Sequence, residues 1–156
     1  MAIEKVREYL AGFGMAERIL EFGVSSATVA LAAQALGCEG CRIAKSLAFQ
    51  TAEGPILVIA AGDAKVDNAK YKARFAAKAK MLSPEDTERQ VGHAVGGICP
   101  FAVNEGVRVY LDESLKRFDT VFPACGSANS AIELTIPELE RLSRADGWVD
   151  VCKGWD

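Results

Sequence analysis

Residues 42–61, RIAKSLAFQTAEGPILVIAA, decide the fold. They contain two apolar runs, 42–50 and 55–61, which are separated by the turn signal Ala52-Glu53-Gly54. Apolar runs of this length on both sides of a short, glycine-containing turn are typical of a β-hairpin. The sequence therefore predicts two paired strands in this region, and Gly62-Asp63 ends the second of them.

Helical patterns and short strands surround the hairpin. Val6, Leu10 and Phe13 recur at helical spacing and predict a first helix over 3–13. Further helices are expected over 28–36 with Ser25 or Ser26 as the cap, from Asp67 to about Ala77, from Ser83-Pro84 to Val91, and from Pro137 to about Ala145. Short strands are expected over 18–22, 107–111, 119–122, 131–135 and 148–152, with a single turn over 112–116. Because strand pairs and helices alternate irregularly, we expect an α+β fold whose mixed sheet curls into a partial barrel.

The composition is that of one ordinary globular domain. The chain has 156 residues, of which 50% are hydrophobic and 25% charged, and this is enough to build a core. We therefore expect a single domain over residues 1–156. The net charge of −3 argues against a protein that coats nucleic acid nonspecifically.

One local segment is basic despite the acidic balance. Between residues 65 and 80 only Asp67 opposes six cations, which are Lys65, Lys70, Lys72, Arg74, Lys78 and Lys80. Such a run is either a solvated helix face or a contact for the phosphates of a nucleic acid.

Nothing in the sequence indicates export or membrane insertion. Residues 1–8 form an amphipathic pattern rather than a charged start followed by an apolar core. The longest apolar stretch, 24–36, is interrupted by polar residues and is too short to span a bilayer. We expect a cytoplasmic protein without a membrane partner.

The cysteines point to buried thiols rather than to a metal site. Cys38-Glu39-Gly40-Cys41 has the spacing of half a zinc site, but no second close pair follows and His93 is the only histidine. We therefore expect no metal, no other cofactor, and reduced cysteines that pack as small apolar groups.

Lys45 and the segment 96–101, GGICPF, are the candidate site features. A lysine inside an apolar strand is paired, reaches solvent with its ammonium group, or awaits an anionic ligand. Glycines let a loop bring backbone N–H groups close to a ligand, and Pro100 fixes the direction in which the loop leaves. Together they predict a site for one charged or carbonyl-bearing substrate. The plain alternatives are a solvent-facing lysine and a connecting loop.

Several separated segments resemble one family. They are KSL at 45–47, IAAGD at 59–63, Gly92-His93 with GGICPF at 96–101, VYLDESL at 109–115, and CGSAN at 125–129 before IEL at 132–134. In order and spacing, over residues 20–150, they resemble the YbaK/EbsC family. That family comprises free-standing relatives of the editing domain inserted in bacterial prolyl-tRNA synthetases.

The resemblance implies both a fold and an activity. The fold is a mixed, strongly twisted sheet or barrel with flanking helices. The activity is hydrolysis of the ester between a wrong amino acid, Cys, Ala, Ser or Thr, and the 3′ adenosine of a tRNA, usually the tRNA for proline. The implied partners are the acceptor end of aminoacyl-tRNA and prolyl-tRNA synthetase. The alternative is a tRNA- or synthetase-binding module of the same fold without catalysis.

The resemblance also assigns residues. The hallmark lysine of the family matches Lys45, and its G-x-x-x-P loop matches Gly96 to Pro100. Ester hydrolysis passes through an oxyanion that needs donors. No serine-hydrolase pattern is visible, and the resemblance implies that the ribose hydroxyl of the substrate helps to activate water. The predicted catalytic residues are Lys45, Gly96, Gly97 and Pro100. The predicted substrate-binding residues are Asp63, His93, Ile98, Gly126 and Ser127.

Two of these predicted residues also fit purely structural roles, and one nearby cysteine is not expected to react. Asp63 follows a strand and fits an ordinary turn. His93 fits equally a loop histidine that is bonded to the backbone. Cys99 is not expected to be a nucleophile, because no base stands at a matching spacing.

We predict that the purified protein contains no stoichiometric zinc, because a structural site needs four ligands and only one close cysteine pair exists. Metal analysis checks this directly. Release of amino acid from mischarged tRNA should also persist in the presence of a chelator. Bound zinc at one equivalent, or activity that is lost on chelation, would contradict the prediction.

Overall fold

The predicted hairpin is the centre of the computed structural model, which describes residues 2–155. β2 (Ile43–Thr51) and β3 (Gly54–Ala61) pair antiparallel along their length. The other strands are β1 (Leu20–Glu21), β4 (Lys65–Val66), β5 (Arg108–Asp112), β6 (Thr120–Pro123), β7 (Ser130–Ala131), β8 (Leu134–Thr135), β9 (Gly147–Val149) and β10 (Cys152–Lys153). The helices are α1 (Ala2–Ala11), α2 (Val29–Leu36), α3 (Asn68–Phe75), α4 (Pro84–Val91) and α5 (Ile136–Ser143). Short 3-10 turns are η1 (Ala16–Arg18), η2 (Gly40–Arg42) and η3 (Glu113–Arg117).

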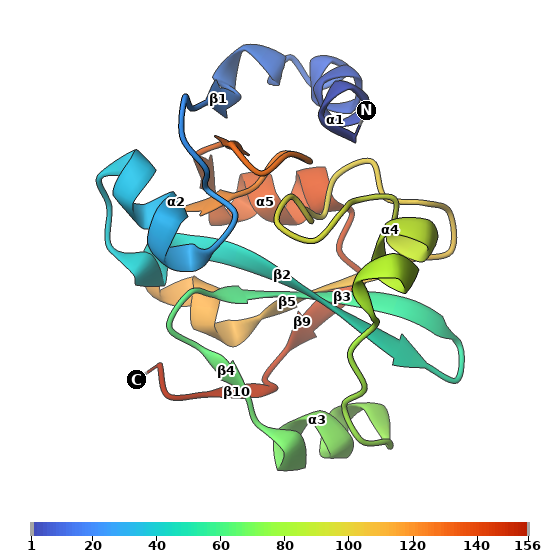
Figure 1. Ribbon diagram of the computed structural model, residues 1–156. Coiled ribbons are helices and arrows are strands. Elements are labelled where there is room, and N and C mark those ends of the chain that lie inside the picture. The colour runs from blue at the N-terminus through green and yellow to red at the C-terminus, as the bar shows by residue number, and fades with distance from the viewer. Residues whose placement is uncertain (1, 156) are drawn as a thin grey trace.

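One mixed sheet contains six strands in the order β8-β6-β2-β3-β5-β9. β2 runs parallel to β6 and β3 runs parallel to β5, so each hairpin strand pairs with a strand from far along the chain. β9 extends the sheet parallel to β5, and β8 lies antiparallel to β6 at the other edge. Figure 1 shows the sheet curled into a half-barrel, with α1 and α5 on one side and α3 on the other. The predicted α+β class with a mixed, curled sheet and flanking helices is confirmed.

Burial explains why β3 has a continuous apolar sequence. Residues 57–61 are fully buried, because β2 and β5 cover both edges of the strand and other elements cover its faces. Val6 and Leu10 of α1 join the same core, as do Leu139 and Leu142 of α5. Each fully buried side chain of this size contributes about 1.5–3 kcal/mol to folding. These contacts fix α1 and α5 against the sheet.

The cap of α2 differs from the prediction. Thr28 is the capping residue, since its side-chain oxygen accepts a hydrogen bond from the backbone N–H of Leu31. Neither Ser25 nor Ser26 has this role. The hydroxyl of Ser25 accepts from the N–H of Ala27 instead and shapes the turn before the helix.

The other helix ends follow from local chemistry. Asp67 and Ser83 cap α3 and α4 as predicted. α3 ends at Phe75, earlier than predicted, because Ala76 adopts a left-handed conformation with φ of 59°. α5 begins one residue before Pro137, after Thr135, which forms a reciprocal capping box with the side chain of Glu138.

Two predicted strands are each split, and one is shortened. The predicted strand 131–135 is divided between β7, which pairs with β1, and β8, which pairs with β6. The predicted strand 148–152 is divided between β9, paired with β5, and β10, paired with β4. At this break a carboxylate oxygen of Asp112 accepts from the N–H of Val151 at 3.0 Å. The predicted strand 18–22 shortens to β1. The positions of these breaks are therefore determined by pairing with strands that are distant in the sequence.

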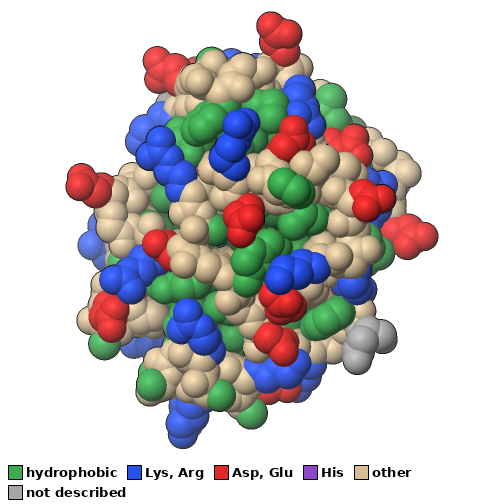
Figure 2. All heavy atoms as spheres, turned by 180° about the vertical axis from the view of Figure 1, so that it is seen from behind, with side chains coloured by type: hydrophobic (Ala, Val, Ile, Leu, Met, Phe, Trp, Pro, Cys, Tyr) green, Lys and Arg blue, Asp and Glu red, His purple; other side chains and the backbone are tan. Residues whose placement is uncertain are grey.

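The surface carries charges of both signs. On the face turned away in Figure 1, acidic and basic side chains are interspersed with hydrophobic ones, and neither sign dominates (Figure 2). Within residues 2–155, no helix is long and apolar enough to cross a membrane.

Gly62 shapes the turn that follows β3. A Cβ atom on this residue would lie 2.0 Å from the carbonyl oxygen of Gly40 and 2.8 Å from Cγ1 of Val29. Only glycine allows η2 and α2 to approach the end of β3 this closely. The carbonyl groups of Gly62 and Ala64 in this turn then meet the side chain of Lys45.

We predict that Gly62→Ala lowers the free energy of unfolding by at least ~2 kcal/mol, because the added methyl group overlaps the backbone of Gly40. Gly23→Ala is the matched control, since a Cβ atom there has no heavy atom within 4 Å. Urea denaturation of both variants measures the difference. Equal unfolding midpoints for Gly62→Ala and the unchanged protein would rule out the close contact.

Candidate functional site

Lys45 is a half-buried cation on β2. Its Nζ donates hydrogen bonds to the carbonyl oxygens of Gly62, at 3.3 Å, and Ala64. Burial lowers the pKa of Lys45, while the nearby carboxylate of Asp63 acts in the opposite direction. The ammonium group is therefore held in one place by the turn after β3, and its charge is partly compensated there.

A cavity of about 250 Å³ lies against Lys45. It is enclosed by β2, the start of α2, the segment 81–87 and the loop 95–98. Most of its wall is apolar, and the polar side chains in it are Ser26, Thr28, Lys45, Ser46, Thr87 and Ser130. The hydroxyls of Ser26 and Ser46 are buried and have no hydrogen-bond partner within residues 2–155. Since an unpaired buried hydroxyl is costly, both are available to a ligand that can pair with them.

The glycine loop contributes Gly96 and Ile98 to this cavity. Gly96 has φ of 101°, a conformation that favours glycine. The N–H of Gly97 donates to the carbonyl oxygen of Ala94 at 3.0 Å. A Cβ atom on Gly97 would lie 2.7 Å from the backbone nitrogen of Ser127. The backbone of Gly97 thus packs directly on the turn that contains Ser127, and this contact sets the position of the loop.

The turn that contains Gly126 and Ser127 lies behind the loop. Gly126 has φ of 92°, and neither residue is part of the cavity wall. The hydroxyl of Ser127 is bonded to Oδ1 of Asn129 at 2.9 Å and to Oγ of Ser130 at 2.7 Å. Ser130 does line the cavity. Ser127 is therefore connected to the cavity through one hydrogen bond.

His93, Cys99 and Pro100 lie outside the cavity wall. His93 is fully buried, with Nε2 2.7 Å from the carbonyl oxygen of Phe101, and burial lowers its pKa. Burial raises the pKa of the Cys99 thiol to about 12, so this thiol is protonated at neutral pH. Pro100 lines a separate hollow of about 180 Å³. The start of the loop faces the cavity, and its end packs into the core.

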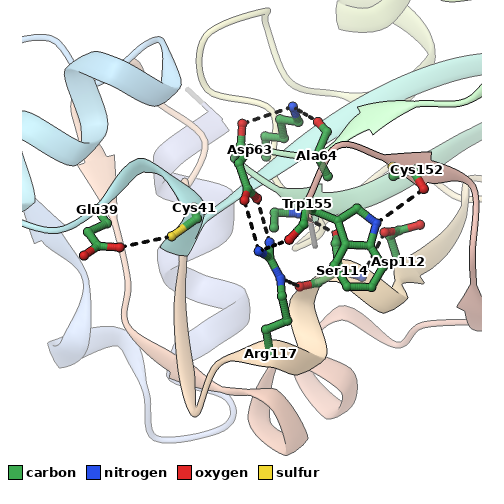
Figure 3. A network of polar contacts seen from close by, with 12 residues as sticks. Glu39, Cys41, Asp63, Ala64, Asp112, Ser114, Arg117, Cys152 and Trp155 are labelled. Atoms are coloured by element: carbon green, nitrogen blue, oxygen red, sulfur yellow. Dashed lines mark hydrogen bonds and ion pairs between the residues drawn. The ribbon is translucent and has the colours of Figure 1, made fainter.

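Asp63 lies in the turn after β3, with its carboxylate directed at Arg117 of η3 (Figure 3). The two hydrogen bonds measure 2.6 and 3.0 Å, and they lower the pKa of Asp63. Arg117 also donates to the carbonyl oxygens of Ser114 and Trp155. Asp63 therefore ties the turn that holds Lys45 to η3 and to the segment after β10.

The structure adds residues that the sequence did not indicate. Ser26 and Thr87 line the cavity from segments with no site motif, and Arg117 reaches Asp63 from 54 positions along the chain. Ser46 also lines the cavity, and the sequence pointed to it indirectly because it follows Lys45 in the KSL motif. In the described part of the chain, no three His, Cys, Asp or Glu side chains gather as metal ligands do.

Sequence comparisons identify relatives of the chain. A sequence model of the aminoacyl-tRNA editing domain matches residues 24–142. The uncharacterized protein YwhH of Bacillus subtilis (strain 168) is 51% identical over 158 aligned positions, which cover all of both chains. The proline–tRNA ligase of Lactiplantibacillus plantarum is 26% identical over 111 positions, which are 70% of this chain but only 19% of the ligase.

Solved structures share the whole fold. The crystal structure of a candidate trans-editing enzyme for prolyl tRNA synthetase superimposes with a TM-score of 0.87 and 29% identity, over 98% of each chain. The crystal structure of the hypothetical protein APE2540 has a TM-score of 0.84 and 25% identity, over 96% of this chain and 99% of the other. Since the family model covers most of the sequence and the fold is shared from end to end, the chain belongs to the aminoacyl-tRNA editing domain family, as its resemblance to YbaK-like proteins predicts.

Proposed function

We propose that the protein is a deacylase that acts in trans on mischarged tRNA and removes a small amino acid, Cys, Ala or Ser, from the tRNA for proline. One observation carries the proposal: the fixed cation Lys45 lines the same cavity as Gly96 and Ile98 of the glycine loop. Family membership and the similarity to a candidate trans-editing enzyme support it. The proposed partners are the acceptor end of the tRNA and prolyl-tRNA synthetase.

In this proposal Lys45 binds the terminal nucleotide. An ammonium group has three N–H donors, and Lys45 uses two of them on Gly62 and Ala64. The third is available for a phosphate or ribose oxygen of the terminal adenosine. Because the amine is ordered before the substrate binds, little further entropy is lost when that contact forms.

The remaining chemistry is positioning and oxyanion stabilisation. The cavity wall in the described chain contains no His, Cys, Asp or Glu side chain. The proposal therefore assigns the activation of water to the ribose hydroxyl of the substrate. It assigns donation to the oxyanion to the backbone N–H groups of Gly96 and Ile98, the residues of the glycine loop that line the cavity. Gly97, Gly126 and Ser127 act by holding that loop. Asp63 and His93 act by holding the turn and the loop end.

A second candidate function is a module that binds tRNA or a synthetase without catalysis. The basic segment 65–80 favours it, because that segment supplies cations without a reactive group. Purified protein and a panel of mischarged tRNAs distinguish the two functions. Release of free amino acid identifies a deacylase, and tRNA binding with no release from any member of the panel identifies the module.

We predict that Lys45→Ala folds normally and loses at least ~100-fold in the rate of deacylation, because the contact to the terminal nucleotide is removed. Initial rates on one mischarged tRNA measure the loss, and circular dichroism verifies the fold. Lys5→Ala, which removes an exposed lysine of α1, is the control and should keep the full rate. A folded Lys45→Ala protein with near-normal turnover would exclude this role.

We also predict faster hydrolysis of tRNA that carries Cys, Ala or Ser than of tRNA that carries Pro. A deacylase acting in trans must spare the correct product, and exclusion by size is the means open to a largely apolar pocket. Ile98→Ala enlarges the cavity wall and should raise the rate on Pro-tRNA, relative to Ala-tRNA, by roughly 10-fold. Val24→Ala, at a side chain that is 64% exposed and not part of the cavity wall, is the control. Equal initial rates on Pro and on the small amino acids would refute the pocket argument.

A further inference from the structure

A second hollow lies at the turn end of the β2–β3 hairpin. Its volume is about 560 Å³, within the range that holds a nucleotide-sized ligand, and it shares no lining residue with the cavity at Lys45. The hairpin turn, the end of α3 and the start of β5 enclose it. Along β2, the six residue steps from Lys45 to Thr51, which lines this hollow, correspond to roughly 20 Å.

Packed aromatic rings form one wall of this hollow. Phe49, Tyr71, Phe75 and Tyr110 follow one another with ring centroids 5.1, 4.8 and 5.3 Å apart. Tyr71 is 1% exposed and Tyr110 8% exposed, so these rings are fixed in the core. All of them except Phe49 line the hollow.

Two arginines stand at this aromatic wall. The guanidinium group of Arg74 lies 4.9 Å from the ring centre of Phe75 and 5.3 Å from that of Tyr110. In the described chain Arg74 has no carboxylate within ion-pair distance. Arg108 pairs with Glu53 at 3.3 Å, where both charged side chains are exposed, and the neighbouring Tyr110 raises the pKa of Arg108. The rings thus hold one planar cation that has no anionic partner, beside a second whose partner is exchangeable.

Further cations stand near Arg74 in the sequence. Lys72, Lys78 and Lys80 are exposed and have no carboxylate partner within residues 2–155. Lys70 differs, because its Nζ is bonded to Asp150 at 3.1 Å and to the carbonyl oxygen of Cys152 at 2.9 Å. Within the basic segment, Lys70 therefore has a structural role, and Lys65 lies apart on β4. Lys72 and Arg74 lie on α3, and Lys78 and Lys80 follow it.

We propose that this hollow binds a nucleotide of an RNA strand. Its phosphate pairs with Arg74 and Arg108, and its base stacks on the guanidinium plane of Arg74. Arginine suits this ligand because it pairs with phosphate in a bidentate manner and also stacks on bases. The identification of this RNA as tRNA rests on the proposed function. The hollow then anchors the tRNA at a second point, remote from the amino acid.

The test uses an uncharged transcript of the tRNA for proline, whose affinity is measured by fluorescence anisotropy over a series of salt concentrations. Arg74→Gln and Arg108→Gln should each weaken binding at least ~5-fold and reduce the slope of log affinity against log salt by roughly 0.7–0.9, the value of one lost phosphate contact. Glu53→Gln should strengthen binding, because it frees Arg108 from its ion pair. Arg7→Gln, on α1 at the opposite end of the molecule in Figure 1, is the control for the loss of one positive charge.

The outcomes separate this proposal from the proposed function, because the probe carries no amino acid and the readout is binding. Unchanged affinity and salt slope in both arginine variants would overturn the nucleotide site and leave deacylation untouched. Equal weakening by Arg7→Gln would show an effect of net charge alone and would also overturn it. A parallel titration with 5′-AMP tests for a free nucleotide: saturable binding of AMP that depends on Arg74, with unchanged tRNA affinity, would exclude an RNA strand as the ligand.

Discussion

Backbone pairing between β2 and β3 is the interaction on which the rest of this structure depends. The register places Lys45 opposite Ala60 and ends with Ala44 opposite Ala61, directly before the turn at Gly62. That register brings the ammonium group to the carbonyl groups of the turn. A shift by one residue would exchange the faces of β2 and move the lysine to the other side of the sheet. Strand pairing thus determines on which side the cation lies.

The same pairing makes a buried charge tolerable. A half-buried ammonium group needs partners, and the carbonyl groups of Gly62 and Ala64 provide them. The turn that carries these carbonyls is held from three directions, by the backbone contact between Gly62 and Gly40, by the ion pair of Asp63, and by the end of β3. The local cost of burying Lys45 is therefore met by backbone groups that are already ordered. No carboxylate bonds the amine directly in the described chain, so one N–H donor of the amine remains for a ligand.

Local signals in the sequence were sufficient for the hairpin, for the class, and for the caps at Asp67 and Ser83. They were not sufficient where the partner lies far away in sequence. The splits in the strands near 132 and 150 depend on which distant strand each half meets, and the pairing of Asp63 with Arg117 spans segments with no common motif. Motif spacing indicated Lys45, Gly96 and Ile98, which the fold does bring to one cavity. It could not separate them from Gly97, a glycine required by backbone packing against Ser127.

The parallel pairing of the hairpin with β5 and β6 has a consequence for the order of folding. The hairpin closes a short loop and can form within microseconds, whereas β3 with β5 and β2 with β6 must wait for long stretches of chain to come together. The cavity at Lys45 is built from β2, from the loop 95–98 and from Ser130, so it spans both of these late closures. A chain with only the hairpin formed has the lysine but neither the loop nor the far wall. During synthesis, the cavity at Lys45 is therefore completed only after residue 131 has emerged and docked, and shorter nascent chains lack part of its wall.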